Sequence, residues 1–270
     1  MSEFEFFKMS ASGNDFILID NRDKKVNKKF KQIADFVAKA CRRRHSVGAD
    51  GVILIESSKN ADFSWKFFNA DGSEAEMCGN GGRCAARFAF IKGIAGKEMA
   101  FETIAGIIKA TVDGSRVKLQ LTTPCDIKLD YPINLVENEI FLSSVNTGVP
   151  HAILLSDDID HVPVEELGRV IRYHKAFGEK GTNVDFVKIV DRENIHIRTY
   201  ERGVEGETFA CGTGAVASGV ILKEKGLIES PVNILTKGGE TLKVYINNEV
   251  YLEGNALVIY TGMLNDEALL

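Results

Sequence analysis

Two cysteines in this sequence stand in closely similar settings. Cys78 precedes Gly79-Asn80-Gly81-Gly82, and Cys211 precedes Gly212-Thr213-Gly214-Ala215. In both places an apolar, helix-like run follows and ends at a glycine, at the same distance from its cysteine. Two equivalent thiols suit a reaction that needs an acid and a base on opposite sides of one carbon atom.

The start of a helix favours a reactive sulfur. Several backbone N–H groups there have no intrahelical partner, and they carry a partial positive charge. We therefore expect the pKa of each cysteine to lie below its free value of about 8.5. The glycines let backbone N–H groups approach an anion closely. In a single segment of this kind, the cysteine is more often a packed structural residue and the glycines serve only the turn. The matched pair instead favours two reactive thiols, each beside backbone N–H groups that can bind a carboxylate.

The similarity continues upstream of both cysteines and predicts a duplicated fold. Gly48–Ile53 precedes Cys78 as Gly181–Phe186 precedes Cys211, and further upstream Gly13–Leu18 matches Gly148–Ile153. We predict an N-terminal half, 1–122, that carries Cys78 and a C-terminal half, 123–257, that carries Cys211. The C-terminal strand 258–270 is a candidate addition to the first half.

The pattern of apolar residues predicts many strands and few helices. Helices are expected at Phe30–Cys41, Arg83–Lys92, Glu165–Tyr173 and Ala215–Lys225. Strands are expected at Phe16–Asp20, Gly51–Ile55, Phe63–Phe68, Ile107–Val112, Val117–Leu121, Ile153–Leu155, Phe186–Val190, Ile195–Tyr200, Thr241–Ile246 and Val250–Leu252. The two helices that follow the cysteines are apolar over most of their surface, which is typical of buried helices. We predict an α+β fold with two pseudo-symmetric, strand-rich halves, each wrapped around a buried central helix, and an active site in the cleft between them.

Composition argues against several classes of protein. The chain has 270 residues, of which 44% are hydrophobic, and a net charge of −5, so neither nucleic acid nor an anionic membrane is an expected partner. No apolar run approaches the length of a membrane span, and the N-terminus carries acidic residues where a signal peptide carries basic ones. The five cysteines include no CxxC pair. These features favour a reducing cytoplasm over a disulfide framework, and no metal site is expected.

Two long segments carry a family resemblance. Phe68–Cys84, with Asn69-Ala70-Asp71-Gly72-Ser73 and Met77-Cys78-Gly79-Asn80-Gly81-Gly82-Arg83, closely resembles the first signature of diaminopimelate epimerase. Tyr200–Gly214 resembles the second, and Ser12–Phe16 and Gly181–Phe186 resemble two further family segments. The matches spread from residue 9 to residue 214, so the resemblance covers essentially the whole chain.

The resemblance implies a cofactor-independent epimerase that interconverts LL- and meso-diaminopimelate, a step toward lysine and peptidoglycan precursors. One cysteine removes the α-proton as a thiolate and the other delivers a proton to the opposite face as a thiol. By resemblance, Cys211 accepts the proton of the LL substrate, Cys78 donates, and the roles exchange in reverse. Family members are commonly homodimers.

The resemblance also assigns further site residues. Taken alone, Glu201-Arg202 would be a surface ion pair and His151 a structural histidine. By resemblance, Glu201 contacts the substrate amine and tunes a thiol, Arg202 pairs with the distal carboxylate, and His151 supports a catalytic cysteine. The remaining implied substrate ligands are side chains of Asn14, Asn69 and Asn183 and backbone N–H groups of Gly79, Asn80, Gly212 and Thr213.

Two positions depart from familiar members: many members have Asn where this chain has Val149, and some have Gln where it has Gly51. Both changes concern recognition of the substrate and leave the two thiols in place. Cys41, Cys84 and Cys125 have no partner in the repeat and are expected to be structural. Three alternatives stay open: a two-cysteine racemase for proline or hydroxyproline, a non-catalytic binding protein on the same fold, and a thiol redox protein.

Overall fold

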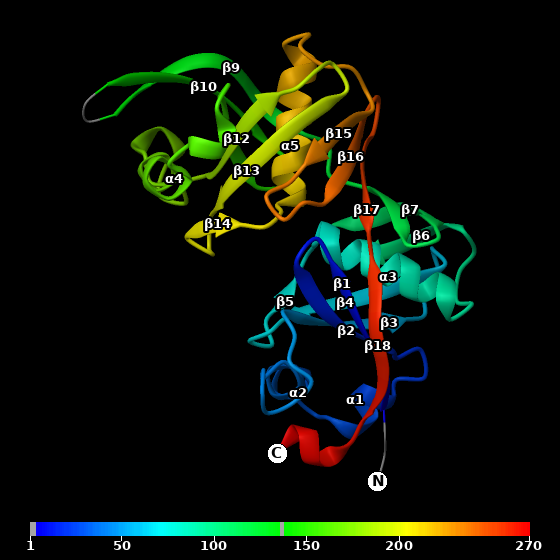
Figure 1. The fold of residues 1–270 in the computed structure, drawn as a ribbon. Helices are drawn as coiled ribbons and strands as arrows, with labels where there is room; N and C mark the ends of the chain where they lie inside the picture. The colour runs from blue at the N-terminus through cyan, green and yellow to red at the C-terminus, as the bar shows by residue number, and fades with distance from the viewer. Residues whose placement is uncertain (1–3, 136–137) are drawn as a thin grey trace. The chain divides into compact units, whose positions relative to one another are not determined.

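The computed structural model describes residues 4–135 and 138–270, and the chain forms two compact units (Figure 1). Unit 1 comprises Met1–Leu119 and Gly254–Leu270, and unit 2 comprises Gln120–Glu253. No helix among the described residues has the length and hydrophobicity needed to cross a lipid bilayer.

Unit 1 contains two antiparallel hairpins joined through parallel pairings. Strand β1 lies antiparallel to β2 and β18, β2 runs parallel to β3, β3 lies antiparallel to β4, and β4 runs parallel to β6. Its strands are β1 (Phe4–Ala11), β2 (Asn14–Asp20), β3 (Gly51–Glu56), β4 (Phe63–Asn69), β5 (Glu74–Ala75), β6 (Glu98–Thr103), β7 (Gly106–Asp113), β8 (Arg116–Gln120) and β18 (Leu257–Leu264). Its helices are α1 (Lys25–Lys29), α2 (Ile33–Ala40), α3 (Gly79–Ile91) and the short η3 (Asp266–Leu269).

Unit 2 repeats this plan. Strand β10 lies antiparallel to β9 and β11, β11 runs parallel to β12, β12 lies antiparallel to β13, and β13 runs parallel to β15. Its strands are β9 (Cys125–Asn134), β10 (Glu139–Asn146), β11 (Pro150–Leu155), β12 (Asn183–Ile189), β13 (Asn194–Glu201), β14 (Gly206–Thr208), β15 (Val232–Leu235), β16 (Thr241–Ile246) and β17 (Val250–Asn255). Its helices are α4 (Val164–Arg172), α5 (Gly212–Glu224) and the short η1 (Ile159–His161) and η2 (Lys175–Phe177).

The strand registers define which residues of the two units correspond. Phe16 pairs with Gly51 in unit 1, as His151 pairs with Asn183 in unit 2. Gly51 therefore corresponds to Asn183. Aligning Gly48 with Gly181 in the sequence instead pairs Asn183 with Asp50, so the sequence repeat is shifted by one residue in this strand.

One long helix, α3 or α5, is buried in each unit (Figure 1). Most residues of both helices are glycine, alanine or other apolar residues, and α5 is buried continuously from Gly214 to Leu222. A helix that is apolar on most sides is stable only when surrounded by protein. The predicted α+β class with two strand-rich halves is confirmed.

The starts of these helices differ from the prediction. They begin at Gly79 and Gly212, directly after the cysteines, and the glycines form the first helical turn. The first turn requires no intrahelical N–H partners, which lowers the demands on its residues. Small residues there also allow close packing, since a Cβ atom on Gly82 would lie 2.7 Å from a Leu119 methyl.

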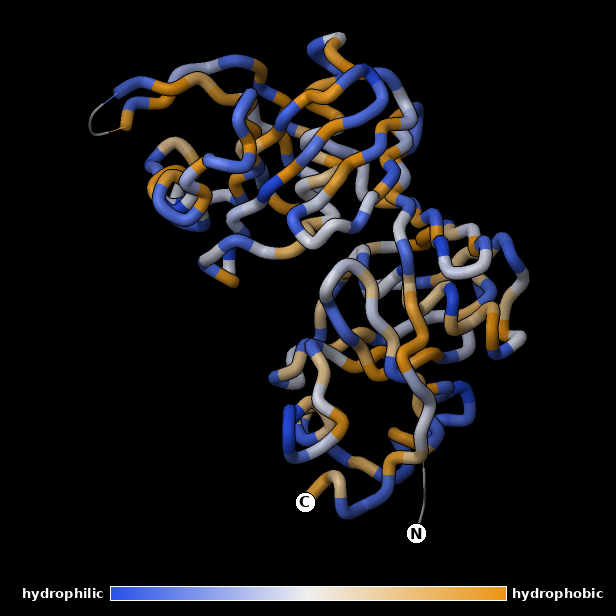
Figure 2. The backbone as a smooth tube through the Cα atoms, in the orientation of Figure 1, coloured by the Kyte–Doolittle hydropathy of each residue, from blue (hydrophilic) through white to orange (hydrophobic). Residues whose placement is uncertain are grey.

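The β9–β10 hairpin has no counterpart among the predicted strands. Most of β9 is exposed, and apolar and polar residues alternate along this strand (Figure 2). Exposed apolar side chains on the hairpin include Ile127, Leu129 and Phe141.

Candidate active site

Cys78 occupies the N-cap of α3 in unit 1. Its backbone is extended, and its Sγ accepts a hydrogen bond from the Gly81 N–H at 3.4 Å. The side chain is partly exposed, whereas most of the helix behind it is buried. The sulfur therefore sits at the positive end of a helix, as predicted.

A chain of amide side chains leads from this helix end to β2 and β3. Asn80 Nδ2 donates to Asn14 Oδ1 at 2.7 Å, and Asn14 Nδ2 donates to Asp50 Oδ2 at 3.1 Å. The fully buried Arg83 donates from Nη2 to Asn80 Oδ1 at 2.8 Å and to Ser12 Oγ at 2.6 Å. Arg83 and Asp50 thus fix the side chains of Asn80 and Asn14, two residues of the predicted site.

Asp15, next to Asn14, belongs to an ion network. Burial raises the pKa of this carboxyl, but hydrogen bonds and charge from Arg43 and Lys8 outweigh burial and lower the pKa to about 2. Arg43 Nη2 also bonds Asp50 at 2.8 Å. The network anchors the loop after α2 to the strand ends that carry Asn14.

Cys211 occupies the corresponding N-cap of α5 in unit 2. Its Sγ lies 3.4 Å from Thr213 Oγ1, and that hydroxyl lies 3.0 Å from His151 Nε2. Asn183 Nδ2 donates to the Pro150 carbonyl at 3.1 Å and also lies 3.4 Å from His151 Nε2. Four residues that the sequence singled out for chemistry thus form one contact group.

The pKa of Cys211 contradicts the expectation from the helix end. Burial raises the pKa of this thiol above its ordinary value, and the carboxylates of Glu201 and Asp185 raise it further. The Thr213 hydroxyl and the Gly214 N–H lower it, but by less. The prediction of a lowered pKa is wrong here because loss of hydration and neighbouring negative charge outweigh the helix terminus.

Glu201 and Arg202 end strand β13 and begin the turn that follows. Burial raises the pKa of Glu201, while the Thr208 hydroxyl and His151 act in the opposite direction. The Arg202 N–H donates to Asn183 Oδ1 at 2.8 Å, so the Asn183 amide is oriented from both ends. Asn69 is the last residue of β4 in unit 1, where it pairs with Gly51. Its side chain is exposed, and its Nδ2 donates to Ser73 Oγ at 3.0 Å.

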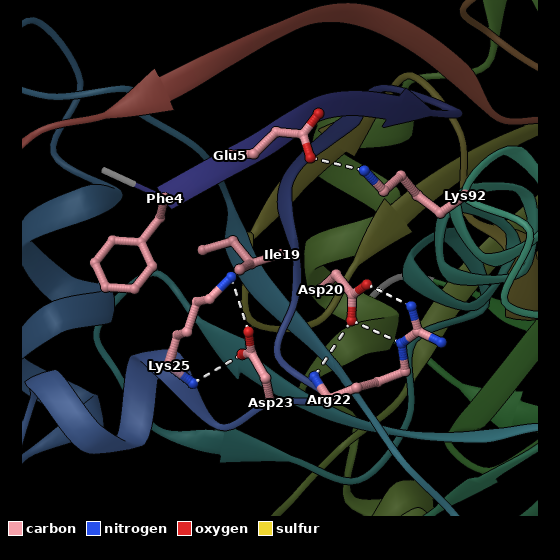
Figure 3. A pocket seen from close by; sticks show the side chains of 8 residues that line it. All are labelled: Phe4, Glu5, Ile19, Asp20, Arg22, Asp23, Lys25 and Lys92. Carbon is pink, nitrogen blue, oxygen red and sulfur yellow. Dashed lines mark hydrogen bonds and ion pairs between the residues drawn. The ribbon is translucent and has the colours of Figure 1, made fainter. Parts of the chain in front are cut away.

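A pocket of about 360 Å³ opens elsewhere on unit 1 (Figure 3). Its charged side chains pair with one another: Glu5 with Lys92, Asp20 with Arg22, and Asp23 with Lys25. It contains none of the predicted site residues and no thiol. Within the part of the chain that the structure describes, no cluster of His, Cys, Asp or Glu side chains is arranged to hold a metal ion.

Comparison with known proteins identifies the family. The diaminopimelate epimerase family model matches residues 6–124 and 143–259. The chain is 51% identical to the diaminopimelate epimerase of Hydrogenobaculum sp. (strain Y04AAS1), over 96% of this chain and 98% of that protein. It is 47% identical to the diaminopimelate epimerase of Aquifex aeolicus (strain VF5), over 98% of this chain and 99% of that protein.

The chain belongs to the diaminopimelate epimerase family.

Solved structures show the same fold at much lower identity. A Bacillus anthracis phenazine biosynthesis protein of the PhzF family superposes with a TM-score of 0.71 at 16% identity, covering 98% of this chain and all of that one. A probable proline racemase from Agrobacterium radiobacter K84 superposes with a TM-score of 0.70 at 15% identity, covering 97% and 93%. At these identities the likeness concerns the fold alone.

The structure explains one of the two departures from familiar diaminopimelate epimerases. A Cβ atom on Gly51 would lie 2.8 Å from a Phe67 ring carbon and still closer to the Phe68 carbonyl oxygen, so β4 leaves no room for a side chain. Val149 lies in the β10–β11 turn, where its carbonyl accepts from the Thr147 N–H at 3.1 Å. Nothing in the structure explains why valine stands there.

The other three cysteines are not among the predicted site residues. Cys41 and Cys84 are buried, and burial raises the pKa of each to about 12. Cys125 is exposed at the start of β9. Their structural role remains a prediction.

Sequence reasoning missed Asp185, whose side chain is fully buried and bonds His151. The signal was available, because an aspartate between Val184 and Phe186 breaks an apolar strand run. Buried carboxylates are rare unless they are paired, so an aspartate in this strand predicts a buried hydrogen-bond or charge partner.

Proposed function

We propose that this protein is a cofactor-independent epimerase that interconverts LL- and meso-diaminopimelate on the route to lysine and peptidoglycan precursors. The observation that carries the proposal is that each unit places one cysteine at the N-cap of its buried helix, Cys78 before α3 and Cys211 before α5. Family membership supplies the substrate.

Cys78 and Cys211 act in this mechanism as acid and base. One sulfur, as a thiolate, takes the α-proton, and the other, as a thiol, returns a proton to the opposite face of the same carbon. At rest one of the two sulfurs is a thiolate and the other is a thiol. The two cysteines therefore share one proton and titrate as a coupled pair. The mechanism requires both sulfurs to reach one carbon atom, and the placement of the active site between the halves stays a prediction.

The α-proton is a very weak acid, so the developing negative charge must be stabilised by fixed dipoles. First-turn N–H groups of both helices can delocalise that charge onto the α-carboxylate. Gly79 and Asn80 offer them in α3, and Gly212 and Thr213 offer them in α5.

In the proposed mechanism, the remaining site residues recognise the substrate. Glu201 binds the ammonium group, and Arg202 binds the distal carboxylate through its planar guanidinium. Asn14, Asn69 and Asn183 complete the polar contacts, because each amide can both donate and accept. Supporting this assignment, Asn14 and Asn183 are held in defined orientations by Asp50 and by the Arg202 N–H.

The test is α-hydrogen exchange in deuterium oxide without added cofactor. We expect LL-diaminopimelate to take up deuterium while it converts to the meso form, and Cys78→Ala and Cys211→Ala each to abolish conversion. Cys125→Ala is the matched control and should keep full activity, because Cys125 is exposed at the start of β9. Inversion of proline with no reaction of diaminopimelate would favour the racemase alternative, and near-normal turnover in either active-site variant would refute the two-base mechanism.

The proposal includes a cytoplasmic homodimer. A sulfur that exchanges protons must stay reduced, and all five cysteines are free. Strand β18 exposes four apolar side chains, Leu257, Ile259, Tyr260 and Met263, which supports an association through this strand. Light scattering on the eluting protein should give the dimer mass, and Tyr260→Asp should shift it toward the monomer; a monomeric wild type would refute the association.

A further inference from the structure

A fully buried histidine–aspartate pair lies beneath the Cys211 end of α5. His151 Nδ1 and Asp185 Oδ2 are 2.6 Å apart, and both side chains have no exposed surface. Thr199 Oγ1 donates to the other carboxylate oxygen, Asp185 Oδ1, at 2.7 Å. Burying a carboxylate is costly, and here two donors compensate it.

These contacts assign the protons of the pair. Ionised Asp185 can only accept, so Nδ1 of His151 carries a proton and the neutral ring has its lone pair at Nε2. Nε2 is 3.0 Å from Thr213 Oγ1, which is in turn 3.4 Å from Cys211 Sγ. A continuous hydrogen-bonded path therefore runs from the sulfur to the imidazole.

At the corresponding described positions of unit 1, apolar residues replace the histidine and the aspartate. Gly81 faces Ile53 as Gly214 faces Asp185, and these two residues pair with Leu18 and Ile153. Phe16, two residues before Leu18, therefore stands where unit 2 has His151. Phe16 and Ile53 are both apolar and buried, so the two cysteines have different surroundings.

We infer that Asp185 is a positioning residue that holds His151 as the proton acceptor of Cys211, with the Thr213 hydroxyl as the relay. The Cys211 S–H proton moves to Thr213 Oγ1 as the hydroxyl proton moves to His151 Nε2, which leaves a thiolate and an imidazolium. No electrons are exchanged, and Asp185 stabilises the imidazolium. The relay rests on the proposed function for its purpose, because it prepares Cys211 to take the substrate's α-proton.

Proton transfer from Cys211 to His151 and direct ionisation of Cys211 depend in opposite ways on the charges around His151. The groups that face it are Asp185 on β12, Glu201 on β13 and Cys211 at the start of α5. Both carboxylates raise the pKa of the thiol. Removing the charge of Asp185 would thus ease direct ionisation of Cys211, whereas it would hinder ionisation through His151.

The decisive variant is Asp185→Asn, which keeps the volume of the side chain. Alkylation of Cys211 and Cys78 by iodoacetamide is followed by peptide mass spectrometry across neutral and alkaline pH. We expect the midpoint for Cys211 to move to higher pH by about one unit or more, as loss of a charge partner implies, with Cys78 unchanged. A Cys211 midpoint that stays or falls would overturn the relay.

Asp191→Asn is the matched control. Asp191 lies in an exposed turn of the same unit, where it accepts hydrogen bonds from Glu193 and Asn194. It should leave both midpoints unchanged; a shift of the Cys211 midpoint equal to that of Asp185→Asn would count against the inference.

A measurement on the wild type covers the case in which Asp185→Asn does not fold. Nitrogen-15 NMR of labelled histidine, assigned with His151→Gln, should show the neutral ring protonated at Nδ1. Protonation at Nε2 would overturn the assignment. Neither readout uses substrate, so failure of the relay and failure to epimerise diaminopimelate are separate outcomes.

Discussion

Gly214 provides a sharp test of how the second unit is packed. It lies in the first turn of α5, and a Cβ atom there would fall well inside 3.0 Å of Asp185 Oδ1 and 3.1 Å from Asp185 Cγ. Gly214→Ala must therefore move either the helix or the Asp185 carboxylate. Moving the carboxylate weakens its bonds to His151 and Thr199.

Opposing effects determine how much Gly214→Ala changes the free energy of unfolding. Alanine is favoured over glycine inside a helix by up to about 1 kcal/mol. Overpacking a well-filled site costs roughly 1–3 kcal/mol, and a hydrogen bond to a charged group contributes about 1.5–3 kcal/mol. The protein will undergo whichever movement, of the helix or of the carboxylate, costs less free energy. We therefore expect Gly214→Ala to lower the free energy of unfolding by about 1–2 kcal/mol.

Gly81→Ala is the matched control in unit 1. Its Cβ atom would lie 3.2 Å from Ile53 Cδ1, the end of a flexible side chain, so the neighbour can turn away. We expect a change within about 0.5 kcal/mol of zero, since the gain in helix propensity offsets mild crowding. Urea unfolding is followed by circular dichroism for the whole chain and by fluorescence of Trp65, the single tryptophan, for unit 1. Equal stability of Gly214→Ala and wild type, or a larger loss in Gly81→Ala, would refute the argument.

Three further predictions concern unit 1. Gly51→Gln should lower the free energy of unfolding by about 1–3 kcal/mol in urea, because its Cβ atom would meet the Phe68 carbonyl oxygen; unchanged stability would contradict this. Asp15→Asn should cost at most about 2 kcal/mol at neutral pH, because the lowered pKa of Asp15 stabilises the fold above pH ~4. That difference should shrink as pH falls from about 4 through 2, because the wild-type carboxyl then becomes protonated too, and a pH-independent difference would count against the ion network with Arg43. Cys84, fully buried with a pKa of about 12, should resist alkylation in the native protein, and rapid labelling at mildly alkaline pH would show that α3 opens.

Strands with a clear alternating or β-branched pattern were predictable from the sequence. The strand expected at Thr241–Ile246 is β16, residue for residue. Strand β1 was missed because Phe6-Phe7 interrupts its apolar–polar alternation, and the burial of six of its eight residues is not visible in the sequence. Strand β9 was missed because seven of its first eight positions are exposed and none of them is buried.

The candidate site was predictable where it depends on helix ends and signature segments. Both cysteines lie at helix N-caps, and Asn14 meets Asn80 as residues of one site should. Electrostatics was less predictable. The helix end argued for a lowered thiol pKa, but the burial of Cys211 and the approach of Glu201 depend on tertiary packing that local sequence does not reveal.

The two units share a backbone plan but differ where their sheets face the long helices. Side chains alternate between the faces of a strand, so a one-residue shift in alignment assigns a residue to the wrong face. Aligned on the glycines of the repeat, Asp185 corresponds to Val52; aligned on strand register, it corresponds to Ile53, which faces α3 beside Gly81. Both alignments match the carboxylate with a buried apolar residue, but only the strand register matches Asp185 with the residue that faces the long helix.

The stability of the fold does not require the buried His151–Asp185 pair of unit 2. Unit 1 fills the corresponding positions with Phe16 and Ile53, both buried, and forms the same strand pairings. A buried ion pair is often no more stabilising than apolar residues of similar size. A fold that needed only a core could use the unit 1 solution twice. The pairing of His151 with Asp185, directed through Thr213 at one of the two cysteines, is better explained by the need to move a proton at that sulfur.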